Sequence, residues 1–115
     1  MSQSTAYFRP ATHAQGLANY PHARTVTSPD GKGSYIYVSG TSSRRGASEG
    51  KASIHDVLDA TVFLTNMKDD YKGMNEEWNR IWPDRNTAPA RTTVEVRALP
   101  REEILVEIKC TVFYT

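Results

Sequence analysis

One segment of the chain, residues 69–82, has the periodicity of an amphipathic helix. Asp69 or Asp70 can cap its start, and Pro83 ends it because proline cannot continue a helix. Its large apolar side chains follow one another at spacings of three, four and three residues, which places them on one face: Tyr71, Met74, Trp78 and Ile81. We expect this face to pack in a core, because no basic patch accompanies it as a nucleic-acid surface would require.

The segments before this helix favour strands. Residues 34–38 are aromatic and β-branched, and the turn residues 28–31 connect them to a second candidate strand at residues 23–27. The strand should end at Ser39 and Gly40. Residues 56–64 form another apolar segment, whose β-branched and aromatic end indicates a strand and whose first half is ambiguous between helix and strand.

Two closing strands are predicted after the helix, because residues 91–96 and 104–114 alternate between apolar and polar side chains. Residues 41–51 contain almost nothing apolar and predict an exposed loop. The predicted fold is therefore α+β, a mixed β-sheet backed by a helix on one face. At this length, residues 1–115 should form a single domain.

Charge and composition exclude several classes of function. The chain has 14 Lys and Arg against 13 Asp and Glu, so its net charge of +1 predicts no nucleic-acid or membrane partner. Cys110 is the single cysteine, which suits a reducing cytoplasm, and no leader-like apolar run is present. His13, His22 and His55 lack the spacing of zinc ligands. We therefore expect a cytoplasmic protein that uses no metal or other cofactor.

The chain from Asp56 to Tyr114 contains a series of short motifs. They are residues 56–64, Gly73-Met74-Asn75-Glu76, Pro89-Ala90-Arg91-Thr92-Thr93-Val94-Glu95-Val96, Leu99-Pro100 and Val106-Glu107-Ile108. Through these motifs this half of the chain resembles the Rid/YjgF family of deaminases. The N-terminal strands extend the likeness through Tyr20 and through Tyr37-Val38-Ser39-Gly40, and residues 40–45 are similar to the 2-aminomuconate deaminase branch.

This resemblance implies a chorismate-mutase-like sheet and a homotrimer whose clefts between subunits bind small carboxylate-bearing ligands. Family members place a further strand and a long helix between the Ser-Gly turn and the segment that matches residues 57–64, where this chain has only residues 41–51. One family helix is therefore missing, through a deletion, an alternative transcript or an omitted piece. Its absence should leave one face of the sheet without its main cover.

Arg91 and Glu107 are the predicted catalytic residues. The planar guanidinium of an arginine binds a carboxylate with two parallel hydrogen bonds, and the resemblance gives this role to Arg91. Glu107 interrupts an apolar strand, and alternation places it on the same face as Leu105. The resemblance implies that this glutamate positions or activates water, as the matching residue of the family does. A carboxylate on a partly buried face can exchange protons with water near neutral pH. The alternative is an exposed Glu107 paired with a lysine or arginine of a neighbouring strand.

Further residues are candidates for substrate binding. Ser39 and Gly40 end a strand where glycine permits close backbone approach to a ligand. Tyr20 could cover the cleft or serve packing, and the resemblance suggests that Asn75 contacts a ligand in the cleft of a neighbouring subunit. Arg44 or Arg45 could bind the distal carboxylate of a dicarboxylic substrate, or could belong to a solvated loop.

The predicted activity is cofactor-independent hydrolytic deamination of an enamine or imine acid, first of all 2-aminomuconate to 4-oxalocrotonate with release of ammonia. The alternatives are a general 2-imino acid deaminase of the 2-aminoacrylate type and a non-catalytic carboxylate-binding protein of the same fold.

Overall fold

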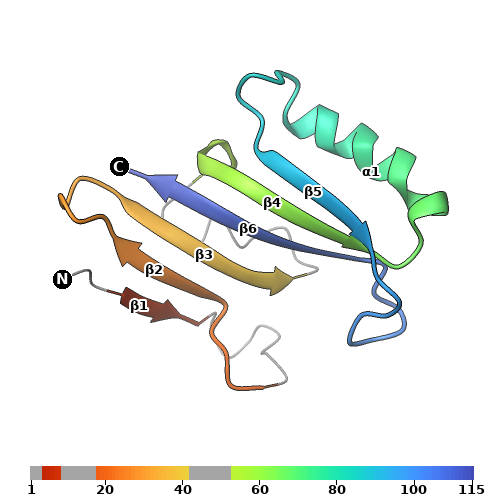
Figure 1. Ribbon diagram of the computed structural model, residues 1–115, viewed down its shortest axis with the longest axis horizontal. Coiled ribbons are helices and arrows are strands. Elements are labelled where there is room, and N and C mark those ends of the chain that lie inside the picture. Colours follow the sequence, from red (N-terminus) through yellow and green to blue (C-terminus); the bar gives the residue numbers. More distant parts are fainter. Residues whose placement is uncertain (1–3, 9–17, 42–52) are drawn as a thin grey trace.

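The computed structural model describes residues 4–8, 18–41 and 53–115. Six strands form one sheet in the order β1-β2-β3-β6-β4-β5, in which β4 and β5 are parallel and the other neighbours are antiparallel (Figure 1). Within the described residues one α-helix lies on the sheet and connects β4 to β5, which confirms the predicted α+β class. The strands are β1 (Ser4–Tyr7), β2 (Ala23–Thr27), β3 (Ser34–Thr41), β4 (Val57–Leu64), β5 (Ala90–Glu95) and β6 (Val106–Tyr114), and the helix is α1 (Met67–Ile81).

The predicted turn between β2 and β3 is confirmed, and its side chains explain its shape. Gly31 adopts a φ of 72°, which a residue without a Cβ tolerates. The hydroxyl of Ser28 donates to Asp30 Oδ1 over 2.7 Å, and the amide of Lys32 donates to the same oxygen over 3.0 Å. The Lys32 amide and the Ser28 hydroxyl, in that order, lower the pKa of Asp30 below its usual range.

Helix α1 begins earlier than predicted, because Asn66 and not Asp69 or Asp70 is its N-cap. Asn66 Oδ1 accepts a hydrogen bond from the Asp69 amide over 3.1 Å. Glu95 Oε1, at the end of β5, accepts another from the Met67 amide over 2.9 Å. Asp69 and Asp70 instead lie in the first turn, where negative charge favours the helix dipole.

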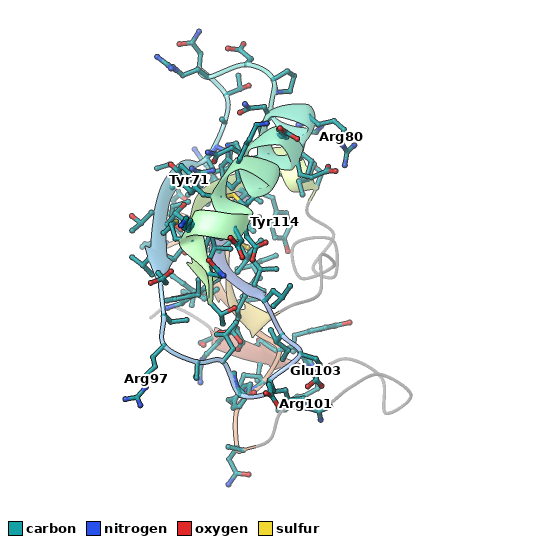
Figure 2. All side chains as sticks on the ribbon, turned by 90° about the vertical axis from the view of Figure 1, so that its right-hand side faces the viewer. Tyr71, Arg80, Arg97, Arg101, Glu103 and Tyr114 are labelled. Atoms are coloured by element: carbon teal, nitrogen blue, oxygen red, sulfur yellow. The ribbon has the colours of Figure 1, made fainter. Side chains whose placement is uncertain are left out.

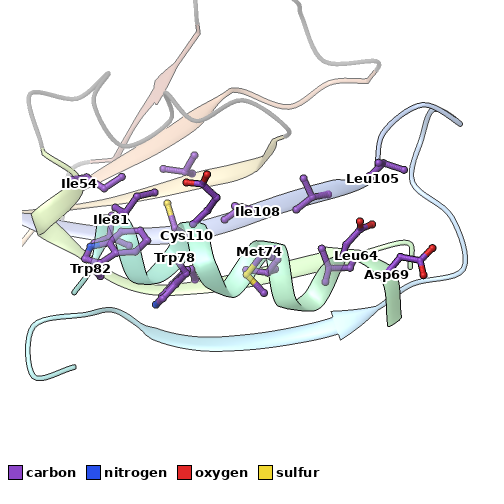
Figure 3. A pocket seen from close by; sticks show the side chains of 18 residues that line it. Ile54, Leu64, Asp69, Met74, Trp78, Ile81, Trp82, Leu105, Ile108 and Cys110 are labelled. Atoms are coloured by element: carbon purple, nitrogen blue, oxygen red, sulfur yellow. The ribbon is translucent and has the colours of Figure 1, made fainter. Parts of the chain in front are cut away.

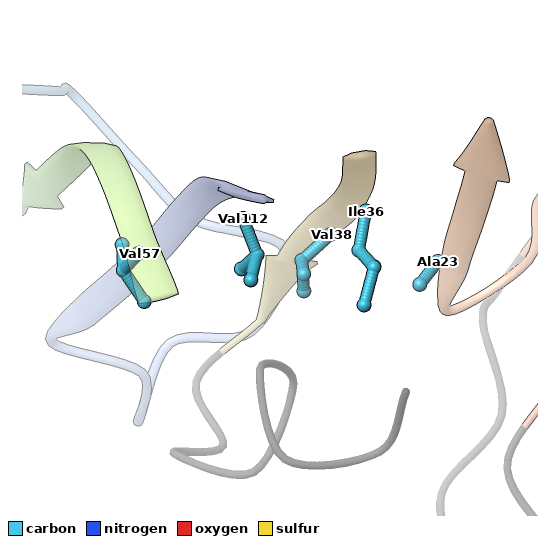
Figure 4. Packing of buried hydrophobic residues seen from close by; sticks show 5 residues of the cluster. All are labelled: Ala23, Ile36, Val38, Val57 and Val112. Atoms are coloured by element: carbon cyan, nitrogen blue, oxygen red, sulfur yellow. The ribbon is translucent and has the colours of Figure 1, made fainter. Parts of the chain in front are cut away.

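The buried core lies on the strands rather than on the helix (Figure 4). Five buried residues from four strands pack together, namely Ala23, Ile36, Val38, Val57 and Val112. None of the helix residues is fully buried, and Tyr71 remains 41% exposed. The apolar face of the helix is therefore less buried than the prediction of core packing implied. Helix α1 contacts the sheet mainly through β4.

A groove of about 480 Å³ runs between α1 and the sheet (Figure 3). Its walls are largely apolar and include Val38, Leu64, Met74, Trp78, Ile108 and Cys110. Whether one face of the sheet lacks its main cover stays a prediction, because most of residues 41–51 lie outside the described residues.

Several boundaries differ from those predicted. Strand β1 was not predicted, because Ser4–Tyr7 lies in a polar stretch. Strand β3 does not end at Ser39 and Gly40 but continues to Thr41 through an irregularity in its pairing with β6. The ambiguous first half of residues 56–64 is strand β4 from Val57 onwards, and Asp56 ends a 3₁₀ turn, Ile54–Asp56, that precedes it. The predicted loop at residues 41–51 lies outside the described residues apart from Thr41.

Candidate functional site

Gly40 and Glu107 are in direct contact on the face of the sheet opposite α1. Strand β6 alternates so that Val106 and Ile108 line the groove beneath α1, which places Glu107 on the other face. A Cβ atom at Gly40 would lie 2.6 Å from Glu107 Oε2. The absence of a side chain at Gly40 thus leaves room for the carboxylate of Glu107. Close approach of a ligand to Gly40 stays a prediction. Leu105 precedes β6 and lines the groove, so it does not share the face of Glu107 as predicted.

Ser39 connects this contact to the segment that contains Tyr20. The Ser39 amide donates to the carbonyl of His22 over 2.9 Å, and its hydroxyl donates to the carbonyl of Pro21 over 2.6 Å. Tyr20 precedes Pro21 and is 46% exposed. The structure thus brings the backbone beside Tyr20 together with Ser39, Gly40 and Glu107, and we call these four residues the Glu107 group.

Arg91 lies on the other face, beneath α1. It pairs with Ala60 of β4, which pairs in turn with Cys110 of β6, and both of these line the groove. Arg91 Nη1 donates to Met74 Sδ over 3.4 Å. Its guanidinium carbon lies 4.9 Å from the centre of the Trp78 ring and 5.9 Å from that of Tyr71. Tyr71 projects from α1 near β5 (Figure 2).

Asn75 is half-buried and belongs to the same side of α1, because it lies four residues after Tyr71 and three before Trp78. Arg91, Asn75, Tyr71, Met74 and Trp78 form a second cluster, the Arg91 group. Arg44 and Arg45, the candidates for a distal carboxylate, lie outside the described residues.

Neither predicted catalytic residue has an ionic partner within the described part of the chain. The ion pairs there join Lys72 to Glu76 and Arg80 to Glu77, all on α1. Half-buried Arg91 therefore has no carboxylate within 4.0 Å among the described residues. Glu107, also half-buried, has no lysine or arginine there, so the alternative of a strand-paired Glu107 does not hold for these residues.

Arg91 and Glu107 do not meet within one chain, because their strands present them on opposite faces of the sheet. Their convergence in one pocket stays a prediction that requires a second subunit. Arg91 lies on β5, which is at one edge of the sheet among the strands that the structure describes, a position where a neighbouring molecule can pair.

Sequence reasoning missed the aromatic partners of Arg91. Tyr71 and Trp78 were recognised as one helix face, but which strand residue lies beneath that face depends on tertiary packing. One signal in the sequence could have found them. Arg91 lies at the start of the strand that follows the helix, and the inner face of that helix carries Tyr71 and Trp78.

The remaining reactive side chains are histidines, acidic groups and Cys110. Among residues 4–8, 18–41 and 53–115 no cluster of three histidine, cysteine or acidic side chains has the geometry of a metal site. Cys110 lines the groove beneath α1, where burial, and to a lesser extent the charge of Asp59, raises the pKa of its thiol to about 11. No helix in these parts of the chain is long and apolar enough to cross a bilayer.

Solved structures of other proteins have a fold similar to that of this chain. A YjgF-type family member from Mycobacterium tuberculosis superimposes with a TM-score of 0.76 at 18% identity, over 97% of this chain and 100% of that one. A YjgF family protein from Neisseria meningitidis gives a TM-score of 0.71 at 25% identity, over 96% and 93% of the two chains.

Sequence comparison agrees with the structural likeness. A RutC family protein of Synechocystis is 44% identical over 55 residues, which are 48% of this chain and 40% of that protein. The chain thus matches less than half the length of this curated relative. The model of the family described as Endoribonuclease L-PSP matches residues 44–114, a span that includes β4, α1, β5, β6, Arg91 and Glu107. With more than half of its residues matched, the chain belongs to the Rid/YjgF (L-PSP) family.

Proposed function

We propose that the protein hydrolyses the carbon–nitrogen double bond of imine acids, including those formed from enamine acids, without a cofactor. The observation that carries this proposal is the pair of half-buried, oppositely charged residues Arg91 and Glu107, neither of which has an ionic partner among the described residues. A half-buried cation without a counter-ion is costly, and a substrate carboxylate would offset that cost.

The two residues divide the chemistry between them. Arg91 would bind the substrate carboxylate through two parallel N–H donors. Glu107 would accept a proton from a water molecule as its oxygen attacks the imine carbon, and would return that proton to the nitrogen, which gives a carbinolamine. Transfer of the carbinolamine hydroxyl proton to the nitrogen, again through Glu107, would then break the carbon–nitrogen bond, so that ammonia leaves and a carbonyl group remains. Tyr20 and Ser39 would line the pocket beside Glu107, and Asn75 would contact the substrate beside Arg91.

Because the Glu107 group and the Arg91 group lie on opposite faces, the proposed active site lies between subunits. In a closed homotrimer each interface is heterologous, so the edge strand β5 of one subunit can bring its Arg91 to the Glu107 of the next. The exposed Tyr20 would then lie at the same interface.

Mixed oligomers test this arrangement directly. Arg91→Met and Glu107→Gln should each abolish ammonia release from a 2-imino acid. When the two inactive variants are unfolded together and refolded in equal amounts, roughly one quarter of the interfaces receive both native residues. Activity should return to about that fraction of the wild-type value. The control is each variant refolded alone, which should stay inactive.

The results separate the possible arrangements. Recovery in the mixture supports a site shared between subunits. No recovery, with a trimer present in solution, contradicts the shared site, and full activity in either single variant contradicts the assigned roles.

The preferred substrate in this proposal is 2-aminomuconate, with 4-oxalocrotonate and ammonia as products, in the cytoplasm. Its second carboxylate would be bound by Arg44 or Arg45. Arg44→Ala and Arg45→Ala should then reduce turnover of the diacid more than turnover of 2-iminopropionate. An equal loss on both substrates would favour the general imine deaminase, and carboxylate binding without ammonia release would indicate the non-catalytic alternative.

The family description also names RNA cleavage. The net charge of +1 gives little overall attraction for a polyanion, so we retain the imine acid as the substrate. Incubation with single-stranded RNA should leave the RNA intact.

A further inference from the structure

We propose that Trp78 is a positioning residue that orients the guanidinium of Arg91 for carboxylate binding, with Tyr71 and Met74 as weaker supports. This inference rests on the proposed function of Arg91 as the carboxylate-binding group. It adds a positioning role for an aromatic side chain of α1 that does not itself contact the reacting atoms.

The contacts of Arg91 carry the inference. Arginine is most strongly attracted to the electron-rich face of tryptophan, and Trp78 is the nearer of the two rings, at 4.9 Å against 5.9 Å for Tyr71. The sulfur of Met74 accepts one N–H over 3.4 Å. A guanidinium has five N–H donors, so these neighbours hold the group while leaving most of its donors for a ligand.

Aromatic and sulfur neighbours suit this role because they bring no negative charge. A carboxylate partner would orient Arg91 equally well, but it would compete with the substrate for the same two N–H groups. Rings attract the cation through their faces and leave its edge, where the paired donors point, unoccupied.

Trp78 is itself held in place. Its ring lies 4.4 Å from that of Trp82, at an interplanar angle of 46°. Helix α1 is tied to β5 by Glu95, which lies on the same strand as Arg91 and accepts a hydrogen bond from the Met67 amide at the start of α1. The helix and the strand that carry Trp78 and Arg91 are therefore joined at one end.

The test combines two measurements on the full chain. The first is the NMR signal of the Arg91 Nε–H group in the free protein, assigned by its loss in Arg91→Met, which should shift upfield because the group lies near an aromatic face. The second is the dissociation constant for pyruvate, a non-reactive 2-oxo acid that presents the same carboxylate. Trp78→Leu should remove the upfield shift and weaken pyruvate binding roughly 2- to 30-fold, and Trp78→Phe should retain most of both.

A matched control separates positioning from stability. Ile81→Ala removes apolar volume from the same groove, one turn after Trp78 on α1. It should leave the Arg91 signal and the pyruvate affinity unchanged. If Trp78→Leu binds pyruvate as wild type does while Arg91→Met does not bind it, the positioning role is wrong and the carboxylate site stands. If Arg91→Met also binds pyruvate normally, the proposed function fails and the positioning role fails with it.

Discussion

Glu107 Oε2 occupies the space that a side chain at Gly40 would need, since a Cβ at residue 40 would lie 2.6 Å from it. Gly40 on β3 and Glu107 on β6 are far apart in the sequence, but the missing side chain of the first leaves room for the carboxylate of the second. The match constrains where the carboxylate can lie, and the proposed chemistry depends on that position.

Gly40→Ala should therefore reduce activity more than stability. The carboxylate is the end of a flexible side chain and can move aside, so the free energy of unfolding should change by less than about 1 kcal/mol. A displaced base should lower kcat by about tenfold or more. Ammonia release and thermal unfolding measure the two effects.

Gly73→Ala is the matched control for this substitution. An added Cβ at Gly73 meets no atom within 4 Å, and alanine favours a helix interior over glycine by roughly 1 kcal/mol. This variant should be more stable and equally active. Equal activity of both variants would contradict the importance of the Glu107 position.

Glu95 should stabilise the start of α1. Its carboxylate accepts a hydrogen bond from the Met67 amide, which has no partner within the helix. Glu95→Ala should lower the free energy of unfolding by about 0.5–2 kcal/mol, measured by urea denaturation. The control is Glu77→Ala, which breaks the exposed pair with Arg80 and should cost less than about 0.5 kcal/mol. An equal cost for both would contradict the capping role.

Local pattern predicted the elements of this fold better than it predicted their contacts. The periodicity of Tyr71, Met74 and Trp78 identified α1, and alternation identified β5 and β6. Strand β1 was missed because Ser4–Tyr7 has little apolar character and is held by pairing with β2. The N-cap was misplaced by three residues, since Asn66 and Asp69 are both capping types and only the chain path selects between them.

The candidate site was predictable in its residue types and not in its geometry. Alternation within one strand assigns relative faces, but it does not relate the face of β5 to that of β6. The opposite orientations of Arg91 and Glu107 follow from the register in which both strands flank β4. The contact between Gly40 and Glu107 depends on the irregular pairing after Val38, which no local pattern indicates.

Cys110 should react slowly with alkylating reagents at neutral pH. Burial, followed by the charge of Asp59, raises the pKa of its thiol from 9.0 to about 11, so the reactive thiolate is scarce. The rate of iodoacetamide modification should rise until about pH 11 in the native protein and level off near pH 9 in urea. Because the unfolded chain loses this proton first, the contribution to stability is complete below pH 9 and is lost as pH rises towards 11. A native midpoint near 9 would contradict the buried position of the thiol.

The groove beneath α1 should bind an apolar dye in the native protein. It combines a volume of about 480 Å³ with largely apolar walls, and Leu105 at its rim is 55% exposed. Leu105→Asp should lower the fluorescence of bound anilinonaphthalene sulfonate, because a carboxylate at the rim repels the sulfonate and disfavours an apolar ligand. Leu58→Asp is the control, since Leu58 is similarly exposed at 50% but does not line the groove. Near-ultraviolet circular dichroism establishes that both variants keep native packing. Equal dye fluorescence in the two variants would show that the dye binds elsewhere and that the groove is not an open apolar surface.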